Sequence, residues 1–130
     1  MKQLFIFLLL KFLICSNISY AQEIVSKKTV NANYASVIMY HRFGDSRYPS
    51  TNIKKEQFLE HINELLKPKY NIINIEKSLD AINNLKLIKD RSVVITIDDA
   101  YSSVFNFAWP IFKKYKLPFT LFVSTDVVDN

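Results

Sequence analysis

Two adjacent carboxylates directly follow an apolar stretch, and they are the residues of this sequence best suited to chemistry. Residues 93–97 read VVITI, and Asp98 and Asp99 come next. Like charges at this distance repel, and the repulsion grows away from water. A divalent cation relieves it, and two such carboxylates can divide metal binding and proton transfer between them. The alternative is that one of them caps the following helix, for which a single carboxylate suffices.

The apolar pattern around this pair predicts strands that alternate with helices. We predict strands at residues 36–40, 70–75, 92–97 and 118–125, the first and third of them buried, and helices at residues 54–67, 78–87 and 102–115. This alternation is typical of a parallel sheet with right-handed crossovers and helices packed on it. Functional residues of such folds gather at the carboxyl ends of the strands, which is where Asp98 and Asp99 stand.

Some local features of the helices also follow from the sequence. Thr51 and Asn52 are candidate N-caps of the first helix. Pro110 lies within the third helix, which predicts a kink or a second helix starting near Trp109. The buried stripe of the second helix is predicted to consist of its large apolar side chains, Leu79, Ile82 and Leu85.

The N-terminus has the features of an export signal. Lys2 precedes an apolar stretch of eleven residues, 4–14, and a small-residue cleavage site ends at Ala21. A helix that spans a membrane needs about 20 residues, so the short stretch favours a cleaved signal. An uncleaved anchor and a lipoprotein attached at Cys15 are the alternatives. Cleavage removes Cys15, the only cysteine. The mature protein is then expected to have no disulfide and no stable membrane span.

The composition excludes one class of partner. The chain of 130 residues has a formal net charge of +5 and 49% apolar residues, which is typical of a globular protein. Its Lys residues are spread singly and in pairs, whereas nucleic-acid binding favours a concentrated basic face. We therefore expect no nucleic-acid partner.

The stretch from Val93 to Asp129 resembles the first motif region of the NodB-type polysaccharide deacetylases (carbohydrate esterase family 4). These have a T-F-D-D-G-Y core, an apolar helix with proline and a P-A-T-F-F-V strand. Here residues 96–101 read TIDDAY and residues 118–123 read PFTLFV. The region from Val37, beginning VIMYHRF, also resembles family members whose first strand ends in Y-H. The resemblance therefore covers residues from Val37 to Asp129.

The resemblance implies an α/β fold, a partial (β/α) barrel of about three βα units plus a fourth strand. It implies that Asp98 is the general base and Asp99 a ligand of a divalent metal, usually zinc. Thr96 would support the pair, and Tyr101 would lie near the substrate groove. His41 is expected either at the substrate or packed in its loop. The implied substrates are N-acetylated polysaccharides or chitooligosaccharides, which lose acetyl groups.

The sequence also departs from the family pattern. Ala100 replaces the usual Gly, so a positive φ there would be strained by the Cβ, and Ile97 replaces Phe. The family takes two more metal ligands from an H-[ST]-x-x-H motif, but the only histidines here are His41 and His61. His61 is expected at a helix surface. We therefore expect a truncated, N-terminal deacetylase portion that is inactive alone and self-associates through its open sheet edge.

The expected organisation is a signal peptide at residues 1–21, a lead-in segment at 22–35 and the deacetylase portion at 36–130. The protein would reside in the periplasm, at the cell surface or outside the cell. The main alternative function is an exported, non-catalytic carbohydrate-binding remnant with sugar-stacking aromatics, Tyr40, Tyr48, Tyr101 and Trp109. A receiver-like phosphoacceptor domain is excluded, because its acidic pair follows its first strand and it has no export signal.

Overall fold

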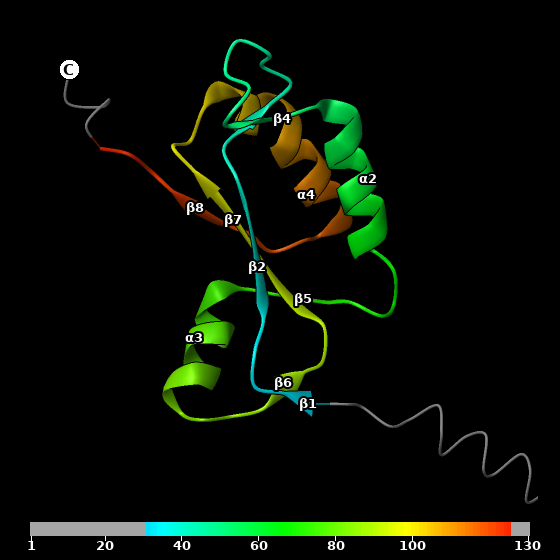
Figure 1. The fold of residues 1–130 in the computed structure, drawn as a ribbon, viewed down its shortest axis with the longest axis vertical. Helices are drawn as coiled ribbons and strands as arrows, with labels where there is room; N and C mark the ends of the chain where they lie inside the picture. Colours follow the sequence, from blue (N-terminus) through cyan, green and yellow to red (C-terminus); the bar gives the residue numbers. More distant parts are fainter. Residues whose placement is uncertain (1–30, 126–130) are drawn as a thin grey trace, which may run out of the picture. The chain divides into compact units, whose positions relative to one another are not determined.

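The structure, a computed structural model, describes residues 31–125 (Figure 1). The predicted signal peptide lies outside the described residues. The strands are β1 (Asn31–Ala32), β2 (Ser36–Tyr40), β3 (Arg42–Phe43), β4 (Asn52–Ile53), β5 (Asn71–Ile73), β6 (Ile88–Lys89), β7 (Ser92–Asp98) and β8 (Thr120–Phe122). The helices are α2 (Lys55–Leu65), α3 (Ile75–Asn83) and α4 (Trp109–Tyr115), which directly follows a π-helical turn, η1 (Val104–Ala108).

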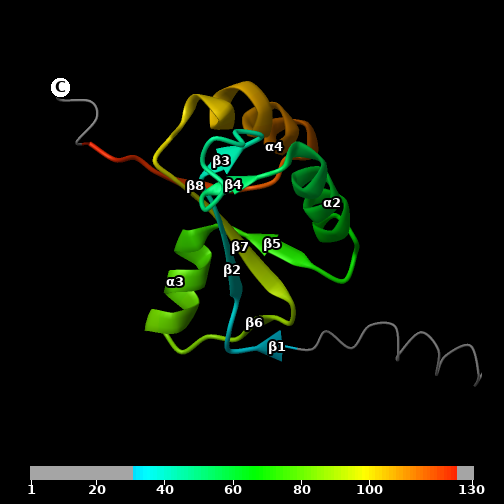
Figure 2. The ribbon, with the colours of Figure 1, turned by 45° about the horizontal axis from the view of Figure 1, so that its top comes forward.

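Four strands form a parallel sheet with β7 at its centre. β2 pairs with β7 over its full length, from Ser36 to Tyr40. β5 pairs with the beginning of β7 and β8 with its end, where Asp98 lies opposite Phe122. Figure 2 shows β7 between β2 and β5. The predicted parallel α/β sheet is thus confirmed, whereas the barrel stays a prediction.

Helices pack on both faces of this sheet because side chains alternate along a strand. Val93, Ile95 and Ile97 of β7 belong to the main core, together with residues of α2, η1 and α4. Val94 points to the other face and packs in a smaller cluster with Ala81 of α3. Figures 1 and 2 accordingly show α2 and α4 on one side of β7 and α3 on the other.

Aromatic rings fill the main core. The Phe58 side chain of α2 is fully buried, and its ring centroid lies 4.7 Å from that of Phe43 and 5.4 Å from that of Tyr40. The ring centroids of Phe107 in η1 and Phe112 in α4 lie 5.9 Å and 5.5 Å from that of Phe58. Aromatic pairs of this kind add about 0.5–1.5 kcal/mol beyond the burial of their area. Phe58 therefore joins the end of β2 to the helix that follows β7.

The N-terminus of α2 differs from the prediction. Its N-cap is Lys54, whose backbone N–H donates to Gln57 Oε1 at 3.3 Å. The predicted caps, Thr51 and Asn52, are wrong because Asn52 forms part of β4. The Asn52 side chain instead accepts a hydrogen bond from the Asp45 N–H at 2.7 Å. It thus closes the loop before the helix rather than the helix itself.

The buried stripe predicted for the second helix is also wrong. Ser78 and Ala81 are the buried residues of α3, and their small side chains let the helix lie close to the sheet. Leu79 and Ile82 are exposed on the outer side. The helix ends before Leu85, which is 93% exposed. The apolar spacing in this segment therefore does not mark the face that packs on β7.

The interruption predicted at Pro110 is confirmed. α4 starts at Trp109, and the Trp109 N–H donates to the carbonyl of Val104, five residues back. Proline has no N–H and its ring clashes with the preceding turn of an α-helix, so a wider turn accommodates it. Val104, Ala108 and Phe112 are buried.

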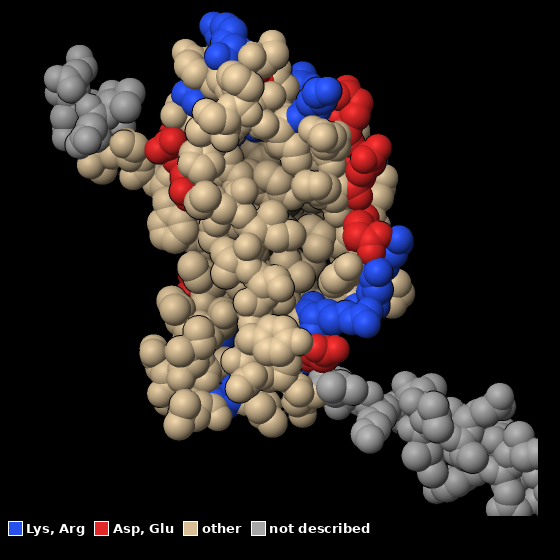
Figure 3. All heavy atoms as spheres, in the orientation of Figure 1, with Lys and Arg blue, Asp and Glu red and all other residues tan. Residues whose placement is uncertain are grey.

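The side of the sheet occupied by β2 is only partly covered. Val37 and Met39 are 62% and 59% exposed, so the prediction that this strand is buried is wrong. Within residues 31–125, β2 has no strand partner besides β7. Figure 3 shows that uncharged side chains cover this region and that charged ones gather over α2. None of the helices in the described part of the chain could cross a membrane.

Candidate functional site

The ends of β2 and β7 bring two predicted site residues together. Tyr40 lies opposite Ile97 in the parallel ladder, so His41 and Asp98 are the next residues on each strand. The His41 Nε2 and Asp98 Oδ2 atoms are 3.8 Å apart. The side chains are 22% and 29% exposed, so both are accessible from solvent yet partly screened. At this distance the imidazole and the carboxylate are within ion-pair range but are not hydrogen-bonded.

Asp99 begins a strained turn. Asp99 and Ala100 both have left-handed backbone conformations, with φ of 69° and 50°. The Asp99 N–H donates to the Phe122 carbonyl at 2.9 Å, which ties the turn to β8. The strain expected at Ala100 is thus confirmed.

Replacing Ala100 with Gly is expected to stabilise the fold by about 1 kcal/mol, because Gly adopts positive φ without the Cβ clash. Urea denaturation of the two proteins measures the difference. Ala81→Gly is the matched control, since Ala81 is helical and this change should destabilise by about 1 kcal/mol. Equal destabilisation by both changes would show that the turn carries no strain.

The other two predicted residues flank the acidic pair. Thr96 is buried and lies two residues before Asp98, so the two side chains share one face of β7. Tyr101 is half-buried, and the Arg42 guanidinium lies over its ring, 3.4 Å from the ring centroid. Ser103 is the N-cap residue of η1, without a side-chain capping bond. Neither carboxylate therefore occupies that capping position.

A cavity of about 340 Å³ adjoins His41. It is lined by the end of β2, the loop leading into β4, β4 itself and His61 of α2. Beside it, the Tyr40 hydroxyl and His61 Nδ1 are hydrogen-bonded at 2.9 Å. Burial raises the pKa of Tyr40 to about 12, so this phenol is an even weaker acid than an ordinary tyrosine. The cavity is thus lined by both histidines and this phenol, and His41 lies between it and Asp98.

The described residues do not complete a metal site. Within residues 31–125, no group of three or more His, Cys, Asp or Glu side chains could hold a metal ion. A catalytic zinc site uses three protein ligands and a water. Asp98, Asp99 and His41 by themselves therefore do not fit the zinc site that the resemblance implies.

The aromatic residues of the carbohydrate-binding alternative do not form a shared platform. Tyr40 is buried in the main core, at 6% exposure. The rings of Tyr48 and Tyr101 lie against Arg42, with its Cζ atom 3.9 Å and 3.4 Å from their centroids. Trp109 is half-exposed but packs on Phe119, away from these rings. These contacts favour a structural role for the tyrosines.

Arg42 is the residue of this region that sequence reasoning misses. It follows His41 at the end of a strand, the position where functional side chains of parallel folds gather. This position at a strand end was the feature of the sequence that could have identified Arg42. Its contact with Tyr101 could not be predicted, because Tyr101 comes from a loop that is distant in the sequence.

Comparisons with known proteins find similarity to one family. Residues 87–130 match the family model described as polysaccharide deacetylase, and this stretch includes the acidic pair. YxkH of Bacillus subtilis (strain 168), which is named for the same family, is 26% identical over 96 residues. The match covers 74% of this chain but 34% of YxkH, so the chain spans about a third of this relative.

Solved structures of deacetylases share the fold. The de-N-acetylase from Aggregatibacter actinomycetemcomitans has a TM-score of 0.57 at 26% identity, over 67% of this chain and 36% of that one. IcaB from Ammonifex degensii has a TM-score of 0.60 at 28% identity, over 74% and 40%. The Streptococcus pyogenes deacetylase PplD, at 23% identity and a TM-score of 0.60 over 75% and 44%, supports the fold alone. The resemblance to the polysaccharide deacetylases is thereby confirmed.

Proposed function

We propose that this chain provides the acidic part of the active site of a polysaccharide deacetylase, a hydrolase that removes acetyl groups from N-acetylglucosamine-containing polysaccharide. The observation that carries the proposal is the position of Asp98 and Asp99. They end the central parallel strand within the stretch that matches the family model, and His41 lies 3.8 Å from Asp98. Figures 1 and 2 show that this end of β7 adjoins the ends of β2 and β8.

In this proposal Asp98 is the general base. Its carboxylate accepts a proton from the water that attacks the acetamide carbonyl, and cleavage of the C–N bond releases acetate and leaves a free amine on the sugar. His41 lies beside Asp98, with Nε2 and Oδ2 3.8 Å apart. Thr96 supports the strand end, and Tyr101 borders the substrate groove.

We propose that Asp99 is one ligand of a divalent metal, zinc by resemblance, and that the other ligands lie outside residues 31–125. Calorimetric titration of the 130-residue chain with zinc should then show no Asp99-dependent binding tighter than roughly millimolar, because isolated carboxylates bind zinc weakly. Asp99→Ala is compared with Asp90→Ala, which removes a carboxylate next to Arg91. Micromolar binding that only Asp99→Ala abolishes would show that this chain closes a metal site by itself.

The chain alone is proposed to be inactive for the same reason. A direct test uses a chimera in which residues 31–125 replace the matching part of the Aggregatibacter actinomycetemcomitans de-N-acetylase. We expect the folded chimera to release acetate from a chitooligosaccharide and the 130-residue chain to release none. Acetate release by the chain alone would contradict the proposed inactivity. A folded, zinc-loaded chimera without acetate release would contradict the site assignment.

The setting of this activity is also a proposal. The export signal predicted from the sequence supports a location in the periplasm, at the cell surface or outside the cell, where polysaccharide substrates lie. The second candidate function, a carbohydrate-binding remnant, rests on the half-exposed Trp109 and Tyr48. Binding of the chitooligosaccharide by the chimera without acetate release would favour it.

The partial barrel is proposed from the parallel pairing of β2, β7 and β8.

A further inference from the structure

The turn after Asp98 needs external support. Asp99 and Ala100 are consecutive non-glycine residues with positive φ, a conformation that persists only where neighbouring contacts determine it. On its N-terminal side the turn is fixed by the hydrogen bond from the Asp99 N–H to the Phe122 carbonyl. On its C-terminal side it continues into Tyr101, whose carbonyl accepts from the Val104 N–H at 2.8 Å. A contact that fixes the Tyr101 ring therefore also restrains the turn.

Arg42 contacts that ring from another part of the chain. Its guanidinium lies between two tyrosine rings, with Cζ 3.4 Å from the Tyr101 centroid and 3.9 Å from the Tyr48 centroid. Arg42 Nη1 also donates to Thr51 Oγ1 at 3.1 Å. A planar guanidinium can stack on two rings and still donate in its own plane, which an ammonium cannot do.

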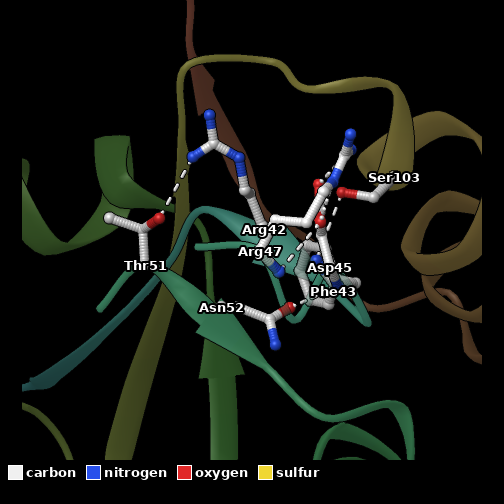
Figure 4. A network of polar contacts seen from close by, with 7 residues as sticks. All are labelled: Arg42, Phe43, Asp45, Arg47, Thr51, Asn52 and Ser103. Carbon is white, nitrogen blue, oxygen red and sulfur yellow. Dashed lines mark hydrogen bonds and ion pairs between the residues drawn. The ribbon is translucent and has the colours of Figure 1, made fainter. Parts of the chain in front are cut away.

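The segment that carries Arg42 is itself well tied. The Arg42 N–H donates to the Thr51 carbonyl at 3.0 Å as part of the pairing of β3 with β4. The next N–H, of Phe43, donates to Ser103 Oγ at 3.2 Å, which joins this segment to the residues just after the turn. Figure 4 shows Arg42 directed to Thr51, and Ser103 directed to Phe43. The backbone of Arg42 is thus held in place by these two hydrogen bonds.

We propose that Arg42 is a positioning residue for the acidic pair. Together with Tyr48 and Tyr101 it forms a clamp, defined by these three residues, that holds the strained Asp99–Ala100 turn. The clamp thereby sets the position of Asp98 relative to His41. The inference rests on the proposed function for the role of Asp98, but the clamp can be tested without any enzymatic activity.

The test uses the ring signals of the two histidines in the tag-free 130-residue chain. Only His41 and His61 contribute to a proton–carbon spectrum of the imidazoles, so His61 on α2 is an internal reference. We expect Arg42→Met to shift or broaden the His41 signal and to leave that of His61 in place. Arg42→Lys should do the same, because it keeps the charge but loses the stacked plane.

Arg47→Met is the matched control. Arg47 also lies near the Tyr48 ring, at 5.6 Å, but its hydrogen bonds go to Asp45, and Figure 4 shows this pair in the same loop. This variant should leave both histidine signals unchanged. Adding Ala100→Gly to Arg42→Met should restore the His41 signal, because the turn no longer needs the clamp.

An unchanged His41 signal in folded Arg42→Met or Arg42→Lys would overturn the proposal. If Arg42→Met does not fold, Arg42→Lys decides in the same way. In the chimera, Arg42→Met should lower kcat by about 10- to 100-fold with little change in KM. A moved His41 signal in a chimera that never releases acetate would retain the clamp and reject the proposed function, so the two failures are distinguishable.

Discussion

Asp98→Asn in the chimera is expected to lower the rate of acetate release by about 100- to 10,000-fold. The amide has nearly the shape of the carboxylate but cannot accept the proton of the attacking water. Its neighbour His41 remains in place, since the contact between them is 3.8 Å and not a tight hydrogen bond. Initial rates of acetate release from a chitooligosaccharide measure the effect.

Asp90→Asn is the control for this change. Asp90 is half-buried like Asp98, but it follows β6 and its charged neighbour is Arg91. The control variant should keep its rate within about twofold, because it removes a carboxylate far from the reacting atoms. A near-normal rate for Asp98→Asn would mean that another group takes the proton.

Phe58→Ala is expected to destabilise the chain by about 3–5 kcal/mol. The side chain is fully buried, and four aromatic rings pack against it within 5.9 Å. Its removal leaves a cavity between α2 and the η1–α4 helix that these rigid rings cannot fill. Urea denaturation followed by circular dichroism gives the free energy of unfolding.

Phe105→Ala is the matched control, because Phe105 is 73% exposed. It should change the free energy of unfolding by less than about 0.5 kcal/mol. Similar losses for the two variants would show that the aromatic cluster does not determine stability. The comparison also tests whether the end of β2, and with it His41, depends on the core around Phe58.

The sequence predicted the fold best where a pattern has one physical cause. The apolar run of β7 could only be a buried strand, and Pro110 could not continue an α-helix, so both features were predicted correctly. The α3 segment failed because Ser78 and Ala81 face the sheet while Leu79 and Ile82 lie outside. Apolar spacing reports amphipathicity, but it does not report how closely a helix approaches its sheet.

The candidate site shows the same division. The position of Asp98 and Asp99 at the end of the central strand was predictable from the apolar run before them, and the strain at Ala100 was expected from the Gly that the family has there. The clamp was not predictable. Arg42 meets Tyr101 across 58 intervening positions only because the ends of β2 and β7 are neighbours in the sheet, and no local pattern encodes that contact.

The central claim is that Asp98 performs the chemistry and does not merely bind sugar. The most direct measurement compares, on one preparation of the Asp98→Asn chimera, its affinity for a chitooligosaccharide with its rate of acetate release. We expect the affinity to match that of the unmodified chimera while acetate release is lost. Loss of binding together with acetate release in a folded protein, or retention of both, would contradict the role of Asp98 as the base.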